Sequence, residues 1–273
     1  MIDPAWLARL QARASVAPRR PRLPLFAQGH QIGSLLADLP RDLPQFNAPK
    51  FQNLLQKKEQ TGEKFWALNG ELTPSLNLLA DLMRSDGVGQ VGHYWRDEQL
   101  AVWSERGERL GSVERGAVRP LGITTRAVHL MGQTANGHMW VQQRALNKAN
   151  DPGLWDTLMG GMVSSQDDLH SALQRETWEE AGLQISGLLH LAQRGRVAIA
   201  RPSEEIDVDP IGLAYTQEHI DWFSCTVPDG VVPHNQDGEV AQFQLLSLPD
   251  LVARLQRDEF TLEAALILVK AIG

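Results

Sequence analysis

The stretch that decides the fold, residues 161–183, reads GMVSSQDDLHSALQRETWEEAGL. In a helix, Glu176, Glu179 and Glu180 fall within about 100° of one another around the axis. The residues of the same stripe one or two turns earlier are apolar: Leu169, Ala172 and Leu173. The sequence therefore predicts a helix whose buried stripe ends in a cluster of carboxylates.

The carboxylate cluster requires a positive partner. Side chains three or four positions apart on a helix approach to about 5–6 Å, so the negative charges repel one another. Carboxylate oxygens are hard ligands that suit Mg²⁺ or Mn²⁺. We therefore expect Glu176, Glu179 and Glu180 to bind a divalent cation, and Arg175, four positions before Glu179, to orient a ligand. A solvated helix end is the ordinary interpretation of a glutamate-rich run, and the two glycines that frame the stretch disfavour it here.

The spacing of the stretch resembles the Nudix box, G-x5-E-x7-R-E-U-x-E-E-x-G-U, in which U is a bulky apolar residue. Two positions depart from it: Asp167 replaces the first glutamate, and Thr177 replaces the first apolar residue. Asp167 is one methylene shorter, which should weaken a contact to the helix or to the metal shell, whereas Thr177 can still pack through its methyl group. The positions that match are Gly161, Arg175, Glu176, Glu179, Glu180, Gly182 and Leu183.

This resemblance implies a fold and an activity. The fold is α/β, a Nudix α/β/α sandwich with a mixed sheet, preceded here by a smaller α+β N-terminal domain. The activity is metal-dependent hydrolysis of a diphosphate linkage in a small organic diphosphate. The general base is implied to be either Glu176 or a glutamate on a later loop, and the protein is expected to form a homodimer.

The loop before residue 240 carries the candidate for that later glutamate. The sequence Asp237-Gly-Glu239-Val precedes an expected strand, and Nudix proteins often place an extra glutamate there as a metal ligand or base. Asp-Gly is also a common hairpin signal, so a plain turn residue is an equally strong interpretation of Glu239. The more acidic run at 204–209 is interpreted as a solvated loop, with a place at the border of the metal site as the alternative.

Residues 143–161, upstream of the box, supply the expected substrate contacts. Arg144 and Lys148 are the local cations that an acidic protein needs to hold phosphate. The segment is similar to the Arg-x-x-x-Lys…Pro-Gly-x-Trp-Asp…Gly-Gly pattern of the Nudix branch related to thiamine pyrophosphokinase, which has an extra N-terminal domain. A position in the core is the alternative for Trp155. The expected substrate contacts are Arg144, Lys148, Trp155, Asp156, Gly160 and Gly161.

That branch implies thiamine diphosphate or an oxidised analogue as the substrate, cleaved to the monophosphate and phosphate. The alternative is a nucleoside-diphosphate sugar or ADP-ribose. Isopentenyl-diphosphate isomerases share the fold but need a cysteine near the strand before the box, where this chain has Thr157-Leu158-Met159. A non-catalytic Nudix-like binding module usually loses the metal carboxylates, which are all present here.

Composition narrows the class of protein. The 273 residues are 42% hydrophobic and 22% charged, as in a soluble globular protein, and the net charge of −7 argues against broad binding to nucleic acid or an acidic membrane. Cys225 is the only cysteine and is expected to be a buried structural thiol. No stretch approaches the about 20 apolar residues of a membrane span. The arginine-rich start lacks the serine of a targeting peptide, and we expect a cytoplasmic location.

Turn signals place a boundary near residue 120, between an N-terminal α+β domain (1–120) and the Nudix domain (121–273). Thr73 and Pro74 are expected as the N-cap and first residue of a helix. Besides the box helix, helices are expected near 4–15, 46–58, 73–83, 249–256 and 261–271. Strands are expected near 26–36, 92–96, 100–104, 109–114, 127–131, 138–143, 155–159, 188–193, 212–217, 221–227 and 240–246.

Overall fold

The computed structural model describes residues 2–39, 44–88, 91–148, 150–203 and 212–272, and it contains both helices and strands on either side of residue 120. Up to residue 117 they are α1 (Pro4–Ala14), β1 (Arg22–Ala27), β2 (His30–Leu36), η1 (Pro44–Asn47), α3 (Pro49–Leu54), β3 (Leu55–Gln60), β4 (Glu63–Leu68), α4 (Leu72–Ser85), β5 (Gln99–Trp103), β6 (Arg109–Glu114) and η3 (Arg115–Ala117). Beyond it they are β7 (Thr124–Gln133), β8 (Met139–Arg144), β9 (Trp155–Asp156), β10 (Met159–Met162), α5 (Leu169–Ala181), η4 (Ile185–Gly187), β11 (Leu189–Pro202), β12 (Tyr215–Thr226), β13 (Val240–Leu246), α6 (Leu248–Gln256) and α7 (Leu262–Ile272).

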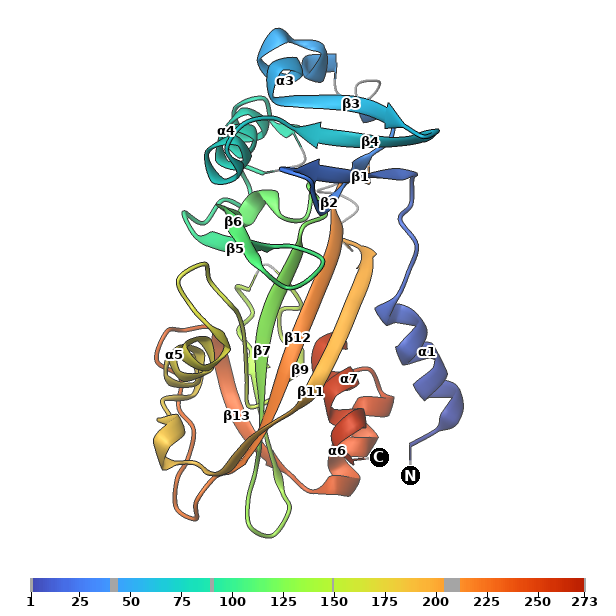
Figure 1. Cartoon of the computed structure of the whole chain (residues 1–273). Helices are drawn as coiled ribbons and strands as arrows, with labels where there is room; N and C mark the ends of the chain where they lie inside the picture. The colour runs from blue at the N-terminus through green and yellow to red at the C-terminus, as the bar shows by residue number, and fades with distance from the viewer. Residues whose placement is uncertain (1, 40–43, 89–90, 149, 204–211, 273) are drawn as a thin grey trace.

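A seven-stranded mixed sheet forms the centre of the later part of the chain (Figure 1). Its strand order is β11-β12-β7-β8-β13, with β10 paired to β7 and β9 paired to β8. Strand β12 runs parallel to β7, and the other pairs are antiparallel. Side chains of β7 are buried on both faces, because Ala127 and Met131 belong to one apolar core and Val128 and Leu130 to another.

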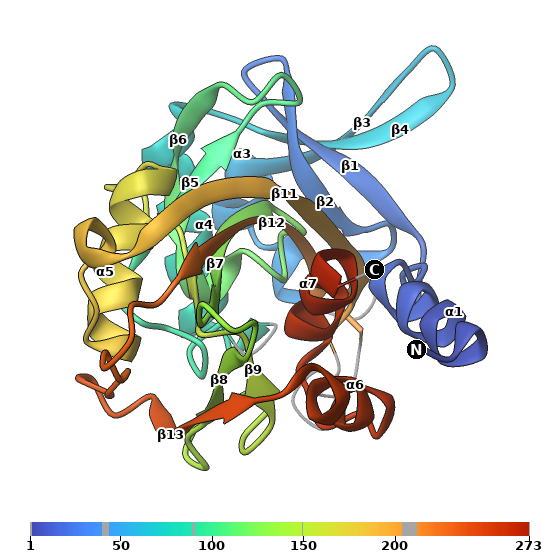
Figure 2. The same ribbon diagram turned by 90° about the horizontal axis from the view of Figure 1, so that it is seen from below.

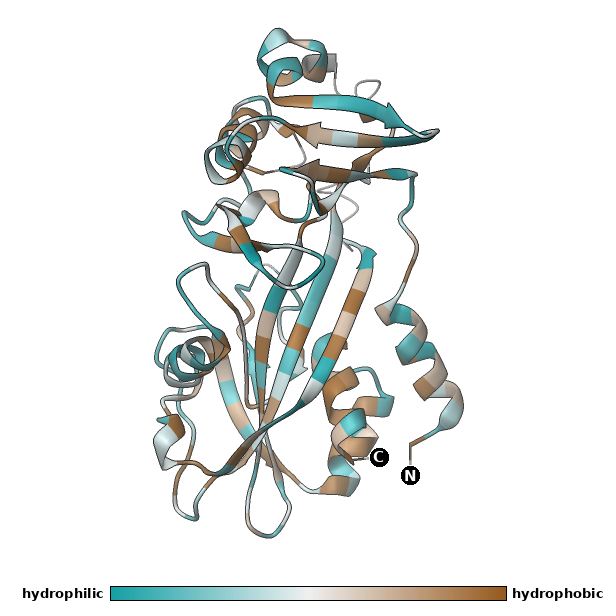
Figure 3. Ribbon diagram, viewed as in Figure 1, coloured by the Kyte–Doolittle hydropathy of each residue, from teal (hydrophilic) through white to brown (hydrophobic). Residues whose placement is uncertain are grey.

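Helices cover both faces of this sheet. Figure 2 shows α5 on one side and α6 and α7 on the other. Helix α5 contributes Ala172 and Leu173 to its core, and α7, hydrophobic along most of its length (Figure 3), contributes Leu266 and Ile267 to the opposite one. The α/β/α sandwich predicted from the sequence is therefore confirmed. None of the helices in the described ranges is long and apolar enough to cross a membrane.

Local signals fix both ends of α5. The Asp168 carboxylate accepts hydrogen bonds from the amides of His170 and Ser171, and the Ser171 hydroxyl accepts one from the Asp168 amide, which is a capping box. Gly182 ends the helix with φ 64°, a conformation that costs glycine little. The carboxylates of the box therefore occupy the last two turns of a helix of fixed length.

The earlier part of the chain contains a four-stranded sheet, order β2-β1-β4-β3, and helix α4, which confirms a small α+β arrangement before the Nudix-like sandwich. Helix α1 does not join it. Trp6 and Leu10 are buried in the same core as α7, and Trp6 Nε1 donates to Asp258 Oδ1 at 3.0 Å. The boundary near residue 120 stays a prediction. Helix α1 precedes that boundary in the sequence but packs into the core of the part that follows it.

Strand pairing corrects several of the expected elements. The strand expected at 26–36 is a hairpin of β1 and β2 that turns at Gln28 and Gly29, whose φ angles are 51° and 86°. The helix expected at 46–58 ends at Leu54, because the next residues pair with β4 as β3. The strands expected at 212–217 and 221–227 are one strand, β12, which pairs with β7 along its length.

Two expectations in the segment around α4 are also wrong. Helix α4 begins at Leu72 with Glu71 as its N-cap, and Thr73 Oγ1 instead accepts a hydrogen bond from the Ser112 amide at 3.0 Å. The side chain of Thr73 therefore ties α4 to β6 and is not free to cap the helix. Residues 92–96 form turns and irregular backbone, not a strand.

The packing of β12 predicts the reactivity of the single thiol. Cys225 is 2% exposed, and burial raises the pKa of its thiol to about 12. Because the thiolate is the reactive form, we expect the native protein to react with DTNB at least about 100-fold more slowly than the urea-unfolded protein. Stopped-flow absorbance measures both rates. Rapid labelling of the native protein would contradict the buried position of Cys225.

Candidate active site

Glu180 lies in the last turn of α5, with its carboxylate buried against strand β10. It is 3% exposed, and its Oε2 accepts hydrogen bonds from the Gly160 amide at 3.0 Å and from Gln142 Nε2 at 2.9 Å. Burial raises the pKa of Glu180 to about 8, although both hydrogen bonds favour the charged form. The two hydrogen bonds therefore do not fully offset the cost of burying the ionised Glu180 carboxylate, and a nearby positive charge would stabilise it.

Glu176 lies one turn earlier on the same face of α5. Its carboxylate accepts a hydrogen bond from Arg175 Nη1 at 2.7 Å, and burial still raises the pKa of Glu176 to about 7. The absence of a side chain at Gly161 makes room for it, because an added Cβ there would lie 2.0 Å from Glu176 Cδ. The glycine of the box is thus required by the close approach of the helix carboxylate to strand β10.

Arg175 binds three acidic side chains at once. Its guanidinium lies 2.8 Å from Asp167 Oδ2, 2.7 Å from Glu176 Oε1 and 3.0 Å from Glu179 Oε2. The predicted pair with Glu179 is therefore present. Burial opposes the charge of Arg175, but its carboxylate partners raise its pKa above the ordinary value. Arg175 therefore holds the carboxylates in place, and its N–H groups donate to acceptors within the protein.

Asp167, which replaces the first glutamate of the box, contacts α5 through Arg175. Its Oδ2 accepts hydrogen bonds from Arg175 Nε at 3.1 Å and from Ser164 Oγ at 3.0 Å. Burial alone would raise the pKa of Asp167, but the hydrogen bonds from Arg175 and Ser164 bring it below its ordinary value. The shorter side chain therefore reaches the helix at normal hydrogen-bond distance, contrary to the expected weakening.

The segment between β8 and β9 brings the two expected phosphate-binding cations to the same place. Arg144 Nη1 lies 3.6 Å from Asp156 Oδ2, and the Arg144 guanidinium also donates to the carbonyl of Asn150. Lys148 Nζ forms an ion pair with Glu239 Oε2. Glu239 therefore lines the cavity as the partner of a cation, although it also follows a turn, and its role as a metal ligand or base stays a prediction.

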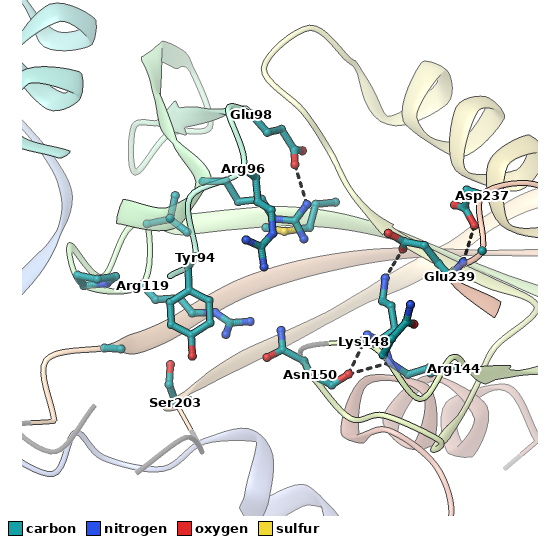
Figure 4. Close-up of a pocket in the computed structure, with 18 residues that line it drawn as sticks. Tyr94, Arg96, Glu98, Arg119, Arg144, Lys148, Asn150, Ser203, Asp237 and Glu239 are labelled. Atoms are coloured by element: carbon teal, nitrogen blue, oxygen red, sulfur yellow. Dashed lines mark hydrogen bonds and ion pairs between the residues drawn. The ribbon is translucent and has the colours of Figure 1, made fainter. Parts of the chain in front are cut away.

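A cavity of about 310 Å³ lies between α5, β10 and this segment. It adjoins a larger cavity of about 600 Å³ that reaches residues 94–120, and Arg144, Lys148 and Glu239 line both (Figure 4). The expected site residues that line the smaller cavity are Arg144, Lys148, Asp156, Gly160, Gly161, Arg175, Glu176, Glu179, Glu180 and Glu239.

Trp155 is the exception among the expected substrate contacts. Its side chain is 8% exposed and belongs to the apolar core beneath α7, where the Arg254 guanidinium lies 4.8 Å from the ring centroid. Consecutive residues of a strand point to opposite faces, so Asp156 faces the cavity while Trp155 faces the core. The expected substrate contact of Trp155 is therefore wrong, and its core alternative holds.

His129 on β7 lines the smaller cavity and was not expected from the sequence. Its Nδ1 lies 3.0 Å from Thr157 Oγ1 and 3.5 Å from Asp156 Oδ1. Burial lowers the pKa of His129, which favours the neutral imidazole. A single polar residue within the apolar run of β7 was the signal that could have identified it.

Other charged residues of the smaller cavity come from segments far apart in the sequence, so that only the fold brings them together. The acidic run at 204–209 lies outside the described residues. The charged residues that line the smaller cavity without having been expected in the site are Glu98, Arg115, Arg119, Asp151, Glu218, Asp237 and Glu263.

The carboxylates of α5 have the donor chemistry that a divalent metal ion needs. Among the described residues, no three His, Cys, Asp or Glu side chains are already gathered around one point, because Arg175 holds Glu176 and Glu179 while Gly160 and its neighbours hold Glu180. Hard oxygen donors nevertheless face one cavity, and two of them have raised pKa values that a nearby cation would lower. Glu176, Glu179 and Glu180 are the side chains that would hold Mg²⁺ or Mn²⁺.

Fold and site together define an α/β/α protein with a carboxylate cluster beside a cavity that several cations line. The sequence profile of the NUDIX domain matches residues 123–266, which is more than half of the chain. The chain therefore belongs to the NUDIX family.

Curated relatives match parts of this chain. The uncharacterized protein YJR142W of Saccharomyces cerevisiae is 25% identical over 190 residues, which cover 64% of this chain and 54% of the yeast protein. The protein named Nudix hydrolase 20, chloroplastic, of Arabidopsis thaliana is 28% identical over 152 residues, 55% of this chain and 38% of the plant protein. An isopentenyl-diphosphate Delta-isomerase of Streptomyces coelicolor is 29% identical over 163 residues, 59% of this chain and 77% of that protein. The matched part spans about half of the yeast relative and less of the plant relative.

The close approach of Gly161 to Glu176 predicts the effect of a single methyl group. Gly161→Ala should displace the Glu176 carboxylate and weaken Mn²⁺ binding by about 10-fold or more. Gly187→Ala is the matched control, because an added Cβ there meets no atom within 4 Å. Electron paramagnetic resonance of free Mn²⁺ gives both affinities. Equal affinity in Gly161→Ala and the unchanged protein would mean that Glu176 does not hold the ion.

Proposed function

We propose that this protein is a Nudix pyrophosphohydrolase that uses Mg²⁺ or Mn²⁺ to cleave the diphosphate linkage of a small organic diphosphate. The observation that carries this proposal is the burial of Glu176 and Glu180, with pKa values raised to about 7 and about 8, beside a cavity that Arg144 and Lys148 also line. A divalent ion would stabilise the charged carboxylates, and the two cations suit phosphate oxygens.

A bound divalent ion would acidify water and neutralise phosphoryl oxygens. In the proposed reaction the oxygen of water forms a bond to one phosphorus, the bridging P–O bond breaks, and a carboxylate takes the proton of water. Glu176 and Glu239 are the two candidates for that base. Glu176 is held by Arg175, whereas the Glu239 side chain is 48% exposed and paired with Lys148, so Glu239 has more freedom to follow a substrate. The products are a monophosphate and phosphate from a terminal diphosphate, and two monophosphates from a nucleoside-diphosphate sugar or ADP-ribose.

Thiamine diphosphate or an oxidised analogue is the first candidate substrate. Its support is the resemblance of segment 144–161 to the thiamine-pyrophosphokinase-related branch, together with the position of five residues of that pattern beside the cavity: Arg144, Lys148, Asp156, Gly160 and Gly161. A nucleoside-diphosphate sugar or ADP-ribose is the second candidate, and the larger cavity of about 600 Å³ has the size of typical small-molecule sites.

Isomerisation of isopentenyl diphosphate is disfavoured in spite of the Streptomyces relative. Cys225 lies on β12 with its side chain in the core on the α5 face, and burial raises the pKa of its thiol to about 12. Thr157 occupies the segment where a catalytic cysteine is needed, and its hydroxyl is hydrogen-bonded to the Met159 carbonyl at 2.8 Å. A non-catalytic binding module is disfavoured because the three carboxylates of the box face the cavity.

The remaining parts of the proposal concern location and partners. We place the enzyme in the cytoplasm as a homodimer that acts on small molecules and not on nucleic acid or membranes. The net charge of −7 and the single cysteine support this placement, since neither suits a polyanion-binding or disulfide-bonded protein.

Removal of one buried carboxylate tests the metal-dependent mechanism. Glu180→Gln keeps the side-chain shape but not the charge, and it should lower kcat by about 100-fold or more. Glu63→Gln, at an exposed position of β4 away from both cavities, should leave kcat unchanged. EDTA should abolish the activity, and added Mg²⁺ or Mn²⁺ should restore it. Full activity of Glu180→Gln, in protein with an unchanged melting temperature, would refute its role as a ligand.

A substrate panel tests the class of diphosphate. We expect the highest kcat/KM with thiamine diphosphate or its oxidised analogue, ahead of ADP-ribose and UDP-glucose, because the pattern of segment 144–161 favours the first class. Phosphate release measures the first two directly, and a coupled phosphatase measures the two sugar nucleotides. A clear preference for a sugar nucleotide would replace the first candidate with the second.

A further inference from the structure

Arg119 differs from the other three cations that line both cavities in having no acidic partner among the described residues. Four cations line both cavities: Arg115, Arg119, Arg144 and Lys148. Arg115 lies 2.6 Å from Glu98, Arg144 lies 3.6 Å from Asp156, and Lys148 is paired with Glu239. Across the described ranges, the guanidinium of Arg119 makes no hydrogen bond and no ion pair.

The backbone around Arg119 is firmly held, so the side chain is presented to the cavity by a fixed segment. The Arg119 carbonyl accepts hydrogen bonds from the amides of Gly122 and Tyr215 at 3.0 Å each. Burial lowers the pKa of Arg119, while the more distant carboxylates of Glu218 and Glu263 oppose this shift. The guanidinium is half-buried and so only partly hydrated, and a ligand with an acceptor oxygen supplies the partner that the protein does not.

Tyr94 lines the larger cavity with Arg119. Figure 4 shows Tyr94 and Arg119 among the side chains that line this cavity, with the Tyr94 hydroxyl pointing toward Ser203. Among the described residues this hydroxyl has no hydrogen-bond partner. Both Tyr94 and Arg119 precede residue 123, where the match to the NUDIX domain begins. An aromatic ring and a donor without a partner therefore face the cavity from outside the matched domain.

We propose that Arg119 and Tyr94 bind the organic half of the substrate, and that they select a planar ring carrying an acceptor oxygen or nitrogen. This inference rests on the proposed diphosphate hydrolysis. The smaller cavity holds the diphosphate beside Glu176 and Glu180, and the larger cavity receives the ring. The ring packs on Tyr94, and its acceptor atom takes a hydrogen bond from Arg119.

Three substrates separate recognition of the ring from recognition of the diphosphate. Thiamine diphosphate and ADP each carry a ring with acceptor atoms, and methyl diphosphate carries none. Arg119→Met should raise KM by about 10-fold or more for whichever ring substrate is cleaved faster, with kcat nearly unchanged. The same variant should leave KM for methyl diphosphate within about 2-fold of the unchanged protein.

Matched variants give the controls. Arg109→Met removes an exposed cation of the same part of the chain, on β6 and away from both cavities, and should change no constant. Tyr94→Ala should raise KM for the ring substrate, and Tyr94→Phe should largely restore it because the ring is kept. Melting temperatures identify any variant that fails to fold. If Arg119→Met does not fold, Tyr94→Ala tests the inference in its place.

The outcomes separate this inference from the proposed function. An equal rise in KM for all three substrates would make Arg119 a phosphate ligand, and no rise for any would leave it without a role in binding; either result overturns the inference. Hydrolysis of none of the three, and of neither ADP-ribose nor UDP-glucose, by the unchanged protein would overturn the proposed function. In that case, calorimetric titration of the Glu180→Gln variant with ADP and with methyl diphosphate tests the inference. ADP should bind more tightly than methyl diphosphate, and this difference in affinity should disappear when Arg119→Met is added.

Discussion

The structure depends on the burial of two carboxylates where helix α5 meets strand β10. Glu180 and Glu176 are carried into the protein by the apolar stripe of α5, which packs Ala172 and Leu173 into the core beside them. Burial raises the pKa of both carboxyl groups, and the local hydrogen bonds only partly offset it. A folded protein keeps such charges at this position when a cation or a reaction requires them.

Arg175 and the glycine pair 160–161 both help to position the carboxylates of α5. Arg175 gathers Asp167, Glu176 and Glu179, and so limits their repulsion without entering the cavity as a free cation. Gly161 allows the backbone of β10 to approach Glu176 more closely than any side chain would permit. In the function that we propose, phosphate binds to Arg144 and Lys148 on a different segment, so that metal and phosphate have their own sets of side chains.

The sequence predicted helix α5 and its ends better than it predicted the earlier part of the fold. The box stretch predicts α5, its ends and its carboxylates because helix periodicity and spacing are local. The acidic partner of Lys148 and the position of His129 depend on strands brought together from distant segments. The hairpin β1–β2 and the strand β3 were missed because pairing with β4 overrides weak local preferences. The sequence wrongly placed Trp155 in contact with the substrate, because Trp155 and Asp156 share a motif while consecutive residues of a strand face opposite sides of the sheet.

Diffraction from crystals soaked in MnCl₂, measured near the manganese absorption edge, tests the central claim most directly. The account predicts an anomalous peak within about 2.0–2.5 Å of carboxylate oxygens of Glu176 and Glu180, at the wall of the smaller cavity. Crystals of Glu180→Gln should lose that peak while keeping the position of α5. Soaked crystals of the unchanged protein with no peak at these carboxylates would contradict the account.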